Sequence, residues 1–280
     1  MPAVSINGAI VAPDQASISV FDRGLLYGDG CFEVLRTWDG VARELDAHLD
    51  RLFETAAALE LRAIERTALV EAAERTIAAA GPGEHRIRIV LTRGPGGLAQ
   101  PFGELGPGAA IVIVEPLPAQ PAAISAAVVD WPLPRRTGRG HKTLAYLDHL
   151  IARELARGAG ADEAIRLDPD GHAVEGATCN LFAVHAGAVI TPPVDAGALP
   201  GIVRARVLAL CAQEAIATVV RPLAVHELRA AEELFATSSL RGIVAVTRLD
   251  GEPRPTGPIT GRIARAYIDA MHVAPRRSDL

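Results

Sequence analysis

Apolar residues recur along this chain with two distinct periods. Over residues 85–92 apolar and polar side chains alternate, which predicts a strand with one buried face. Over residues 45–61 apolar side chains recur at helical spacing, which predicts an amphipathic helix. A second helix is predicted at residues 67–80, before a helix-breaking Gly-Pro-Gly sequence.

Turn signals predict two hairpins. Asn7-Gly8 divides one apolar run, and Asp39-Gly40 separates an apolar run from residues 41–45, which we predict as the returning strand. The Gly/Pro-rich stretch that follows residue 92 is long for a connector, and such loops are often functional.

The second half of the chain mixes short strands with helices. Strands are predicted at residues 109–114, 122–130, 163–167, 172–175, 181–184, 188–191, 218–221, 233–237 and 243–249, and helices at 144–157, 201–214 and 260–271. Antiparallel hairpins with segregated helices indicate an α+β protein in two domains. We expect a smaller N-terminal domain at residues 1–117, a Pro-rich linker at 118–122 and a larger C-terminal domain at 123–280.

Composition and charge exclude several classes of protein. The 280 residues are 49% apolar and 22% charged, as in a globular protein, with a net charge of −5 and no basic block of the kind that binds nucleic acid. No apolar run reaches the roughly 20 residues of a membrane span, and the N-terminus lacks a signal-peptide pattern. Three widely spaced cysteines give neither a disulfide framework nor a metal motif. We therefore expect a cytoplasmic protein without a metal.

One cation differs from all the others. Of the 28 Lys and Arg residues, only Lys142 is a lysine. A genome that favours arginine codons could explain the bias, and most lysines are solvated surface residues. A lysine can nevertheless act as a nucleophile and form an imine, which an arginine cannot. His141, Arg139 and Arg136 would add positive charge near it.

Four further segments carry candidate chemistry, each with a plainer alternative. Leu199-Pro-Gly201 precedes a predicted helix, whose first amides would bind an anion or simply begin the helix. Glu175 lies before a glycine at a strand end and could hold a positive ring nitrogen or be a solvated turn residue. The hydroxyls of residues 237–239 and the Arg51 guanidinium could bind a phosphate or face solvent. Together with Lys142, these segments provide the groups that pyridoxal 5'-phosphate (PLP) requires: an imine-forming lysine, a carboxylate for the ring nitrogen and donors for the phosphate.

The order of these segments resembles the class IV (fold type IV) PLP-dependent aminotransferases over nearly the whole chain. The segments that carry the resemblance are Asp22-Arg-Gly-Leu-Leu-Tyr-Gly-Asp-Gly-Cys-Phe-Glu33, His48-Leu-Asp-Arg-Leu52, Lys142, Gly160-Ala-Asp-Glu-Ala-Ile165, Glu175-Gly-Ala-Thr-Cys-Asn-Leu-Phe182, Leu199-Pro-Gly-Ile-Val-Arg204 and Thr237-Ser-Ser239.

The resemblance implies a two-domain homodimer with PLP between the domains. It implies that Lys142 binds PLP as a Schiff base and moves the substrate proton, and that Glu175 holds the ring nitrogen. The residues implied to bind the rest of the cofactor are Arg51, Tyr146, Leu199, Gly201, Ile202, Val203, Ser238 and Ser239. Substrate-binding candidates are Phe32, Arg36, Arg93, Leu240 and Arg241, although each of these arginines could equally be structural.

The resemblance leaves the reaction open among three members of the family. Phe32-Glu33-Val34 resembles D-amino acid aminotransferases, whereas the sequence that follows Thr92 resembles aminodeoxychorismate lyases. The Arg-x-His carboxylate trap of D-amino acid aminotransferases is absent after Arg93, and Ala145 replaces a common asparagine. We expect a transaminase acting on a D-amino acid or (R)-amine and an α-keto acid. The alternatives are a lyase that releases pyruvate and p-aminobenzoate, then a branched-chain L-amino acid aminotransferase. The alternative from another class of protein is a non-catalytic binder of phosphorylated ligands. Lys142 argues against it, because anion binding alone would accept an arginine.

Overall fold

The computed structural model describes residues 2–62, 64–131 and 140–272, which fall into two compact units. The first unit comprises Met1–Ala119 and His141–Tyr146, and the second comprises Gln120–Gly140 and Leu147–Leu280. The segment that carries Lys142 therefore groups with the first unit, whereas the sequence-based boundaries assign it to the C-terminal domain. Arg136 and Arg139 lie outside the described residues.

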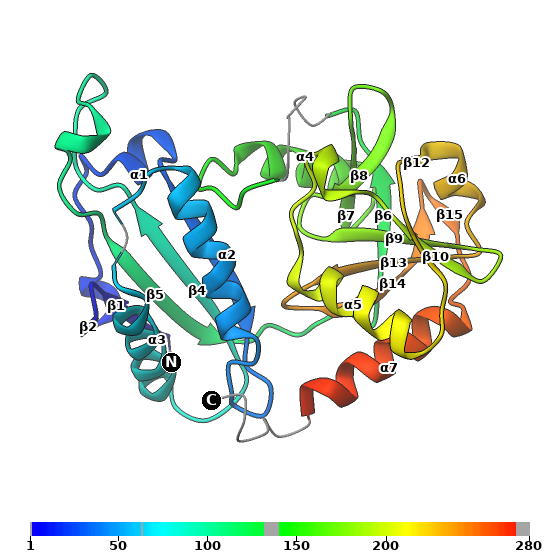
Figure 1. Ribbon diagram of the computed structural model, residues 1–280, viewed down its shortest axis with the longest axis horizontal. Coiled ribbons are helices and arrows are strands. Elements are labelled where there is room, and N and C mark those ends of the chain that lie inside the picture. Colours follow the sequence, from blue (N-terminus) through cyan, green and yellow to red (C-terminus); the bar gives the residue numbers. More distant parts are fainter. Residues whose placement is uncertain (1, 63, 132–139, 273–280) are drawn as a thin grey trace. The chain divides into compact units, whose positions relative to one another are not determined.

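The first unit is built on a five-stranded antiparallel sheet in the order β2-β1-β5-β4-β3 (Figure 1). Its elements are β1 (Ala3–Ile6), β2 (Ala9–Val11), β3 (Gly30–Arg36), β4 (His85–Thr92), β5 (Ala110–Pro116), α1 (Arg23–Tyr27), α2 (Leu45–Ala58) and α3 (Arg66–Ala80), with 3-10 turns at Pro13–Gln15 and Phe102–Glu104. Ile87 and Ile89 of β4 pack with Leu49 of α2 and Leu69 of α3, and all four are fully buried. The helices thus cover one face of the sheet, and the intervening strand residues lie on the opposite face.

The second unit contains a ten-stranded mixed sheet in the order β11-β10-β9-β13-β14-β6-β7-β8-β12, with β15 paired to β14. Its strands are β6 (Ala123–Val128), β7 (Glu163–Leu167), β8 (His172–Gly176), β9 (Asn180–His185), β10 (Ala188–Thr191), β11 (Thr218–Val220), β12 (Leu223–Ala224), β13 (Glu233–Ser238), β14 (Gly242–Leu249) and β15 (Glu252–Pro253). Its helices are α4 (Leu147–Gly158), α5 (Ile202–Gln213), α6 (Val225–Ala230) and α7 (Pro258–His272), with a 3-10 turn at Val194–Ala196.

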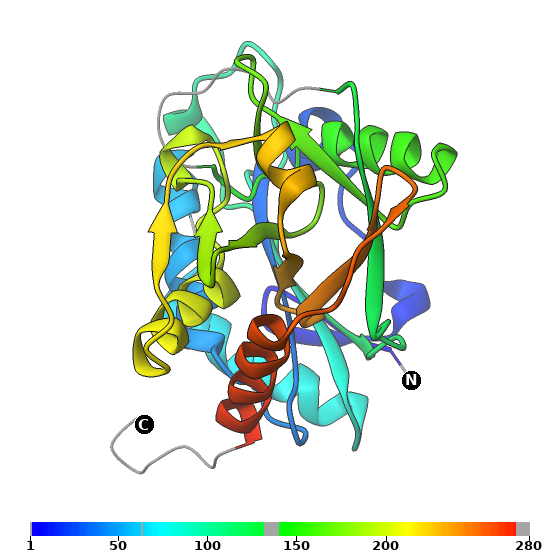
Figure 2. The same cartoon turned by 90° about the vertical axis from the view of Figure 1, so that its right-hand side faces the viewer.

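Alternation along the strands of this sheet builds two cores. Phe182 and Phe235 stack with ring centroids 4.7 Å apart and pack with Val207 of α5 and Ile263 of α7. These two helices lie next to each other (Figure 2). The neighbouring strand residues, such as Leu181, join the other core. Each aliphatic side chain that is fully buried in this way contributes about 1.5–3 kcal/mol to stability. No helix in the described part of the chain is long and apolar enough to cross a membrane.

Most predicted elements are present, and the α+β prediction is confirmed. The predicted strand at 41–45 is wrong: only one bridge, between Trp38 and Val41, closes the turn, and helix α2 already begins at Leu45. The helix predicted from residue 144 begins at Leu147. The short helices α1 (Arg23–Tyr27) and α6 (Val225–Ala230) were not predicted from the sequence.

Candidate active site

Lys142 is fixed by an extra strand pairing at the edge of the first sheet. The Phe32 N–H donates to the Lys142 carbonyl at 3.0 Å, and the Leu144 N–H donates to the Gly30 carbonyl at 2.9 Å. A Cβ on Gly30 would overlap Leu91 and Leu144, so glycine is required for this close approach. The position of the lysine backbone is therefore set by β3.

The side chain of Lys142 lies against two aromatic rings. Its Nζ is 4.7 Å from the centroid of the Phe32 ring and 5.9 Å from that of Tyr146. The two rings meet edge to face at 5.3 Å, and Arg88 of β4 stacks on Phe32 at 4.2 Å. Burial lowers the pKa of Arg88 from its usual value. Arg88 is not predictable as a site residue from the sequence, because an arginine in an alternating strand is typical of a solvent-facing position.

Arg51 is held by a buried carboxylate on the helix-covered face of the same sheet. Its Nε and Nη2 each donate to Glu33 at 2.7 Å, and His48 Nδ1 lies 2.7 Å from the same carboxylate. Glu33 is fully buried. Burial alone would raise the pKa of Glu33, but the hydrogen bonds from Arg51 and His48 outweigh it and lower this pKa to about 2. The carboxylate thus fixes the plane of the Arg51 guanidinium.

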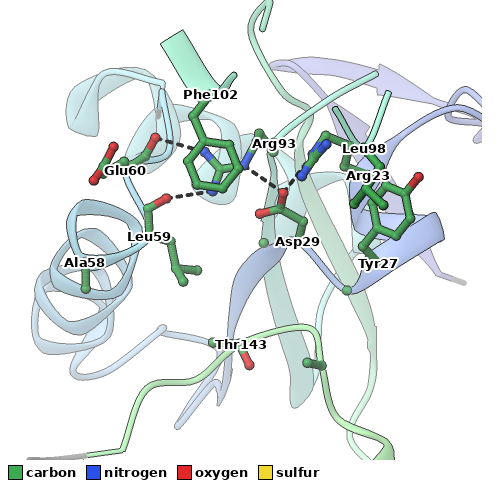
Figure 3. Close-up of a pocket in the computed structure, with 13 residues that line it drawn as sticks. Arg23, Tyr27, Asp29, Ala58, Leu59, Glu60, Arg93, Leu98, Phe102 and Thr143 are labelled. Carbon is green, nitrogen blue, oxygen red and sulfur yellow. Dashed lines mark hydrogen bonds and ion pairs between the residues drawn. The ribbon is translucent and has the colours of Figure 1, made fainter. Parts of the chain in front are cut away.

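A pocket of about 440 Å³ also lies in the first unit, and Thr143 and Ala145 contribute to its lining. At its wall Asp29 accepts hydrogen bonds from Arg23 and Arg93, both at 2.8 Å, and Phe102 stacks on Arg93 at 3.6 Å (Figure 3). Arg93 also donates to the carbonyls of residues 59 and 60. These bonds give the candidate carboxylate receptor Arg93 a structural role in this wall.

Glu175 ends strand β8 in the second unit as a buried carboxylate. It accepts hydrogen bonds from the Leu199 N–H at 2.9 Å and from the Asn180 side chain at 3.4 Å. Asn180 also donates to the Leu199 carbonyl at 2.9 Å. The carboxylate is therefore oriented by the backbone segment that leads into helix α5.

The start of α5 has the form of an anion site. Gly201 is its N-cap, and the first amides of an α-helix, here including Ile202 and Val203, have no partner within the helix. A Cβ on Gly201 would overlap Asn180 Oδ1. The sheet register pairs Asn180 with Thr237, whose buried hydroxyl has no hydrogen-bond partner among the described residues. The helix start, Glu175 and the end of β13 thus meet through Asn180.

The remaining predicted residues lie in a half-buried turn or pair with other protein groups. Ser238 accepts a hydrogen bond from the Arg241 N–H, and Ser239 and Leu240 form the half-buried turn between them. Arg241 pairs with buried Glu163 at 3.1 Å. Arg36 in the first unit stacks on Trp38 at 4.0 Å. Arg36 and Arg241 thus both have protein partners.

The comparisons with known proteins define the class. The family described as amino-transferase class IV matches residues 30–249, and the chain belongs to it. A Methanocaldococcus jannaschii protein with the provisional name branched-chain-amino-acid aminotransferase is 35% identical over 275 residues, 95% of each chain. A D-alanine aminotransferase of Bacillus licheniformis is 28% identical over 276 residues, 96% of each chain.

Solved structures show the same fold. The branched-chain aminotransferase from Thermoproteus uzoniensis with norvaline has a TM-score of 0.90 and 29% identity, covering 96% of this chain and 94% of that one. A T.th. branched-chain amino acid aminotransferase complexed with N-(5'-phosphopyridoxyl)-L-glutamate has a TM-score of 0.88 and 25% identity, covering 96% and 93%. This chain is therefore a fold type IV enzyme.

PLP is the cofactor of this family, and the donors in the chain fit it. The first amides of α5, which follow the N-cap Gly201, are donors of the kind that bind a phosphate, and the sheet register places the buried Thr237 hydroxyl beside Asn180, which packs on Gly201. Glu175 is an oriented carboxylate of the kind that binds a protonated ring nitrogen, and Lys142 is an amine able to bind PLP covalently.

Proposed function

We propose that this enzyme transfers an amino group from an apolar amino acid, such as a branched-chain L-amino acid, to a dicarboxylic α-keto acid. The wall formed by Phe32 and Tyr146 beside Lys142, with Arg88 stacked on the Phe32 ring, carries this proposal. The rings suit an apolar side chain, and the guanidinium suits a second carboxylate. Relatives named as branched-chain enzymes support the same donor.

A D-amino acid donor is the second candidate. Sequence analysis favours it, and D-alanine aminotransferases are 28% identical to this chain. L- and D-amino acids would place their α-carboxylates in different pockets. The same cofactor site therefore serves either enantiomer. The lyase reaction is the third candidate.

Each residue of the proposed machinery has a distinct role. When bound, PLP would supply the electron acceptor that loss of the substrate Cα proton requires. Lys142 holds the cofactor covalently and moves that proton. Glu175 receives the N–H of the ring nitrogen, with its carboxylate held by Leu199. In the second unit, the amides of Ile202 and Val203 with Ser238 and Ser239 would hold the phosphate, and Leu199 would contact the ring. The family resemblance also assigns Arg51 to the phosphate and Tyr146 to the ring.

We also propose a homodimer. Val20, Phe21 and Leu25 are 66%, 69% and 60% exposed around helix α1, and Leu98 is 72% exposed. Apolar side chains exposed together in this way are typical of a protein interface. Light scattering after gel filtration should give twice the chain mass of 29.4 kDa. A cytoplasmic location is consistent with three free, buried thiols.

The donor can be identified from the visible spectrum of the PLP enzyme. L-Leucine, D-alanine or D-glutamate is added without an acceptor, and bleaching of the cofactor band reports amino transfer. We expect bleaching by L-leucine and recovery on adding 2-oxoglutarate. Bleaching by the D-amino acids alone would replace the first candidate with the second. Pyruvate release from aminodeoxychorismate without an acceptor would support the third.

Substituting Arg88→Met should impair the acceptor half-reaction. Loss of a charged hydrogen bond costs about 1.5–3 kcal/mol, so KM for 2-oxoglutarate should rise about 10- to 150-fold. KM for pyruvate should change little, because pyruvate has no second carboxylate. Arg86→Met is the matched control, since Arg86 lies on the same strand and pairs with Glu115. Equal losses for both acceptors would contradict the role of Arg88.

Both Lys142→Ala and Lys142→Arg should abolish turnover. Arginine retains the charge but cannot form the covalent bond to PLP, so the pair separates charge from nucleophilicity. Mass spectrometry after borohydride reduction should find the cofactor on Lys142 in the wild type and in neither variant. Substantial turnover by either variant would refute the assignment.

A further inference from the structure

The hairpin turn between strands β13 and β14 (residues 238–242) carries the two serine hydroxyls proposed to hold the phosphate. The last pair of the two strands, Ser238 with Gly242, closes this turn. Within it the Arg241 N–H donates to the Ser238 hydroxyl at 3.3 Å. Gly242 has a φ of +67°, and a Cβ there would press on a buried aromatic ring. The hairpin itself thus fixes the local shape of the turn.

The Arg241 side chain leaves the hairpin turn and binds a buried carboxylate on another strand. Arg241 Nη1 donates to Glu163 Oε2 at 3.1 Å, and Glu163, the first residue of β7, is 1% exposed. In the sheet, β6 lies between β7 and β14, so this ion pair spans one strand. The Arg241 side chain is only 18% exposed, so water and salt screen the pair little. The ion pair therefore ties the hairpin turn to β7.

The same carboxylate holds the loop that joins β8 to β9. Thr178 of this loop donates to Glu163 twice, through its N–H to Oε1 at 3.2 Å and through its hydroxyl to Oε2. The loop crosses from β8, the neighbour of β7, to β9, the neighbour of β13. Glu163 thus receives donors from the loop and from the hairpin turn, and holds the two segments together.

Both of these segments adjoin the start of helix α5. Asn180, the residue at which the loop enters β9, packs on Gly201 at the N-cap of α5. The ladder of β9 with β13 ends where Asn180 pairs with Thr237, the residue before Ser238. The hairpin turn extends past this last pair, and there the ion pair of Arg241 with Glu163 restrains it.

We propose that Arg241 is a positioning residue that, through Glu163, holds the hydroxyls of Ser238 and Ser239 where they bind the cofactor phosphate. This inference rests on the proposed phosphate site. A turn that must become ordered when a ligand binds lowers the affinity, whereas a turn that is already held avoids this cost. The sequence suggested Arg241 as a substrate-binding residue, but its guanidinium binds Glu163, so it acts through the turn.

Cofactor affinity with and without the phosphate provides the test. The full chain, freed of PLP, is titrated with PLP and with pyridoxal, which lacks the phosphate. Both Arg241→Met and Arg241→Gln should weaken PLP binding about tenfold, or about 1.4 kcal/mol, and change pyridoxal binding less than about twofold. Arg229→Met is the matched control, because Arg229 pairs with Asp250 in the same unit at a more exposed position.

Two results of these titrations would overturn the proposal. One is a PLP affinity that equals that of Arg229→Met in whichever Arg241 variant folds. The other is an equal loss of affinity for PLP and for pyridoxal, because a merely structural role of Arg241 would affect both ligands. If PLP and pyridoxal bind the wild type equally well, the proposed phosphate site itself is wrong. The two ideas can therefore fail separately.

A mutant cycle and phosphorus NMR show where Arg241 acts. In a background with Ser238→Ala and Ser239→Ala, the change Arg241→Met should not weaken PLP binding further, because the hydroxyls that it positions are gone. An undiminished loss in that background would contradict the proposal. The phosphorus-31 signal of bound PLP reports the surroundings of the phosphate without turnover. It should shift in Arg241→Met and stay unchanged in Arg229→Met, and an unchanged signal in both would also contradict the role of Arg241.

Discussion

Replacing Glu33 with glutamine removes one charge from a fully buried ion pair and keeps the size of the side chain. Arg51, which is 8% exposed, would then retain its charge beside a neutral amide. His48 would also lose the anion at its Nδ1. The substitution therefore separates the electrostatic contribution of Glu33 from its packing.

The size of the effect follows from the pKa of Glu33. A folded-state value of about 2 against the usual 4.5 corresponds to about 3 kcal/mol of stability. Because the folded-state pKa is the lower one, this contribution is complete above pH 4.5 and is lost as the pH falls towards 2. Breaking a buried ion pair generally costs about 3–5 kcal/mol, which agrees with this value.

Urea unfolding of the PLP-free protein measures the loss. Glu33→Gln should lower the unfolding midpoint at neutral pH and remove part of the stability loss between pH 4.5 and 2. Glu227→Gln is the control, because the pKa of Glu227 is also lowered to about 2, by hydrogen bonds from Arg221 and the Ala224 N–H. This pair is partly exposed to solvent, so its loss should cost less than about 1 kcal/mol. Similar small losses in both variants would refute the reasoning.

Two further predictions concern the cofactor site and the cysteines. Gly201→Ala would press a Cβ onto Asn180 Oδ1, so PLP affinity in a fluorescence titration should fall at least about tenfold. Gly261→Ala, where the added Cβ meets open space, should leave the PLP affinity unchanged. Equal PLP affinities of the two variants would contradict the proposed phosphate site. Burial raises the pKa of Cys31 to about 12 and that of Cys211 to about 11, so neither thiol should react with Ellman's reagent near pH 8 before unfolding; fast labelling would contradict this.

Sequence patterns predicted the helices and strands that are held in place by burying one row of apolar side chains. The strand His85–Thr92 has the predicted bounds because Ile87, Ile89 and Leu91 all enter one core. Residues 144–146 continue the apolar spacing of α4, but the Leu144 N–H is bonded to Gly30 instead of a helical carbonyl. Local periodicity does not reveal such a long-range pairing.

The sequence proposed site residues where the residue type itself suggested the chemistry, and these assignments stay predictions. Lys142 and Glu175 differ visibly from their neighbours, and the Leu199-Pro-Gly201 sequence marks a helix start. The roles of the arginines were harder to assign, because the sequence does not distinguish one of the 27 arginines from another. Their partners in the structure do distinguish them. Arg93 is held by Asp29, Arg241 by Glu163, and Arg88 was identified only through its stacking on Phe32.

The division of the chain has a consequence for its synthesis. The first unit takes in Met1–Ala119 and then, after a stretch of the second unit, His141–Tyr146. The outer edge of β3 therefore lacks its pairing with Lys142 and Leu144 until the ribosome has produced both segments. A fragment that stops at residue 119 would expose this strand edge, which is prone to pair with other chains. A fragment that begins after residue 146 would lack the lysine altogether.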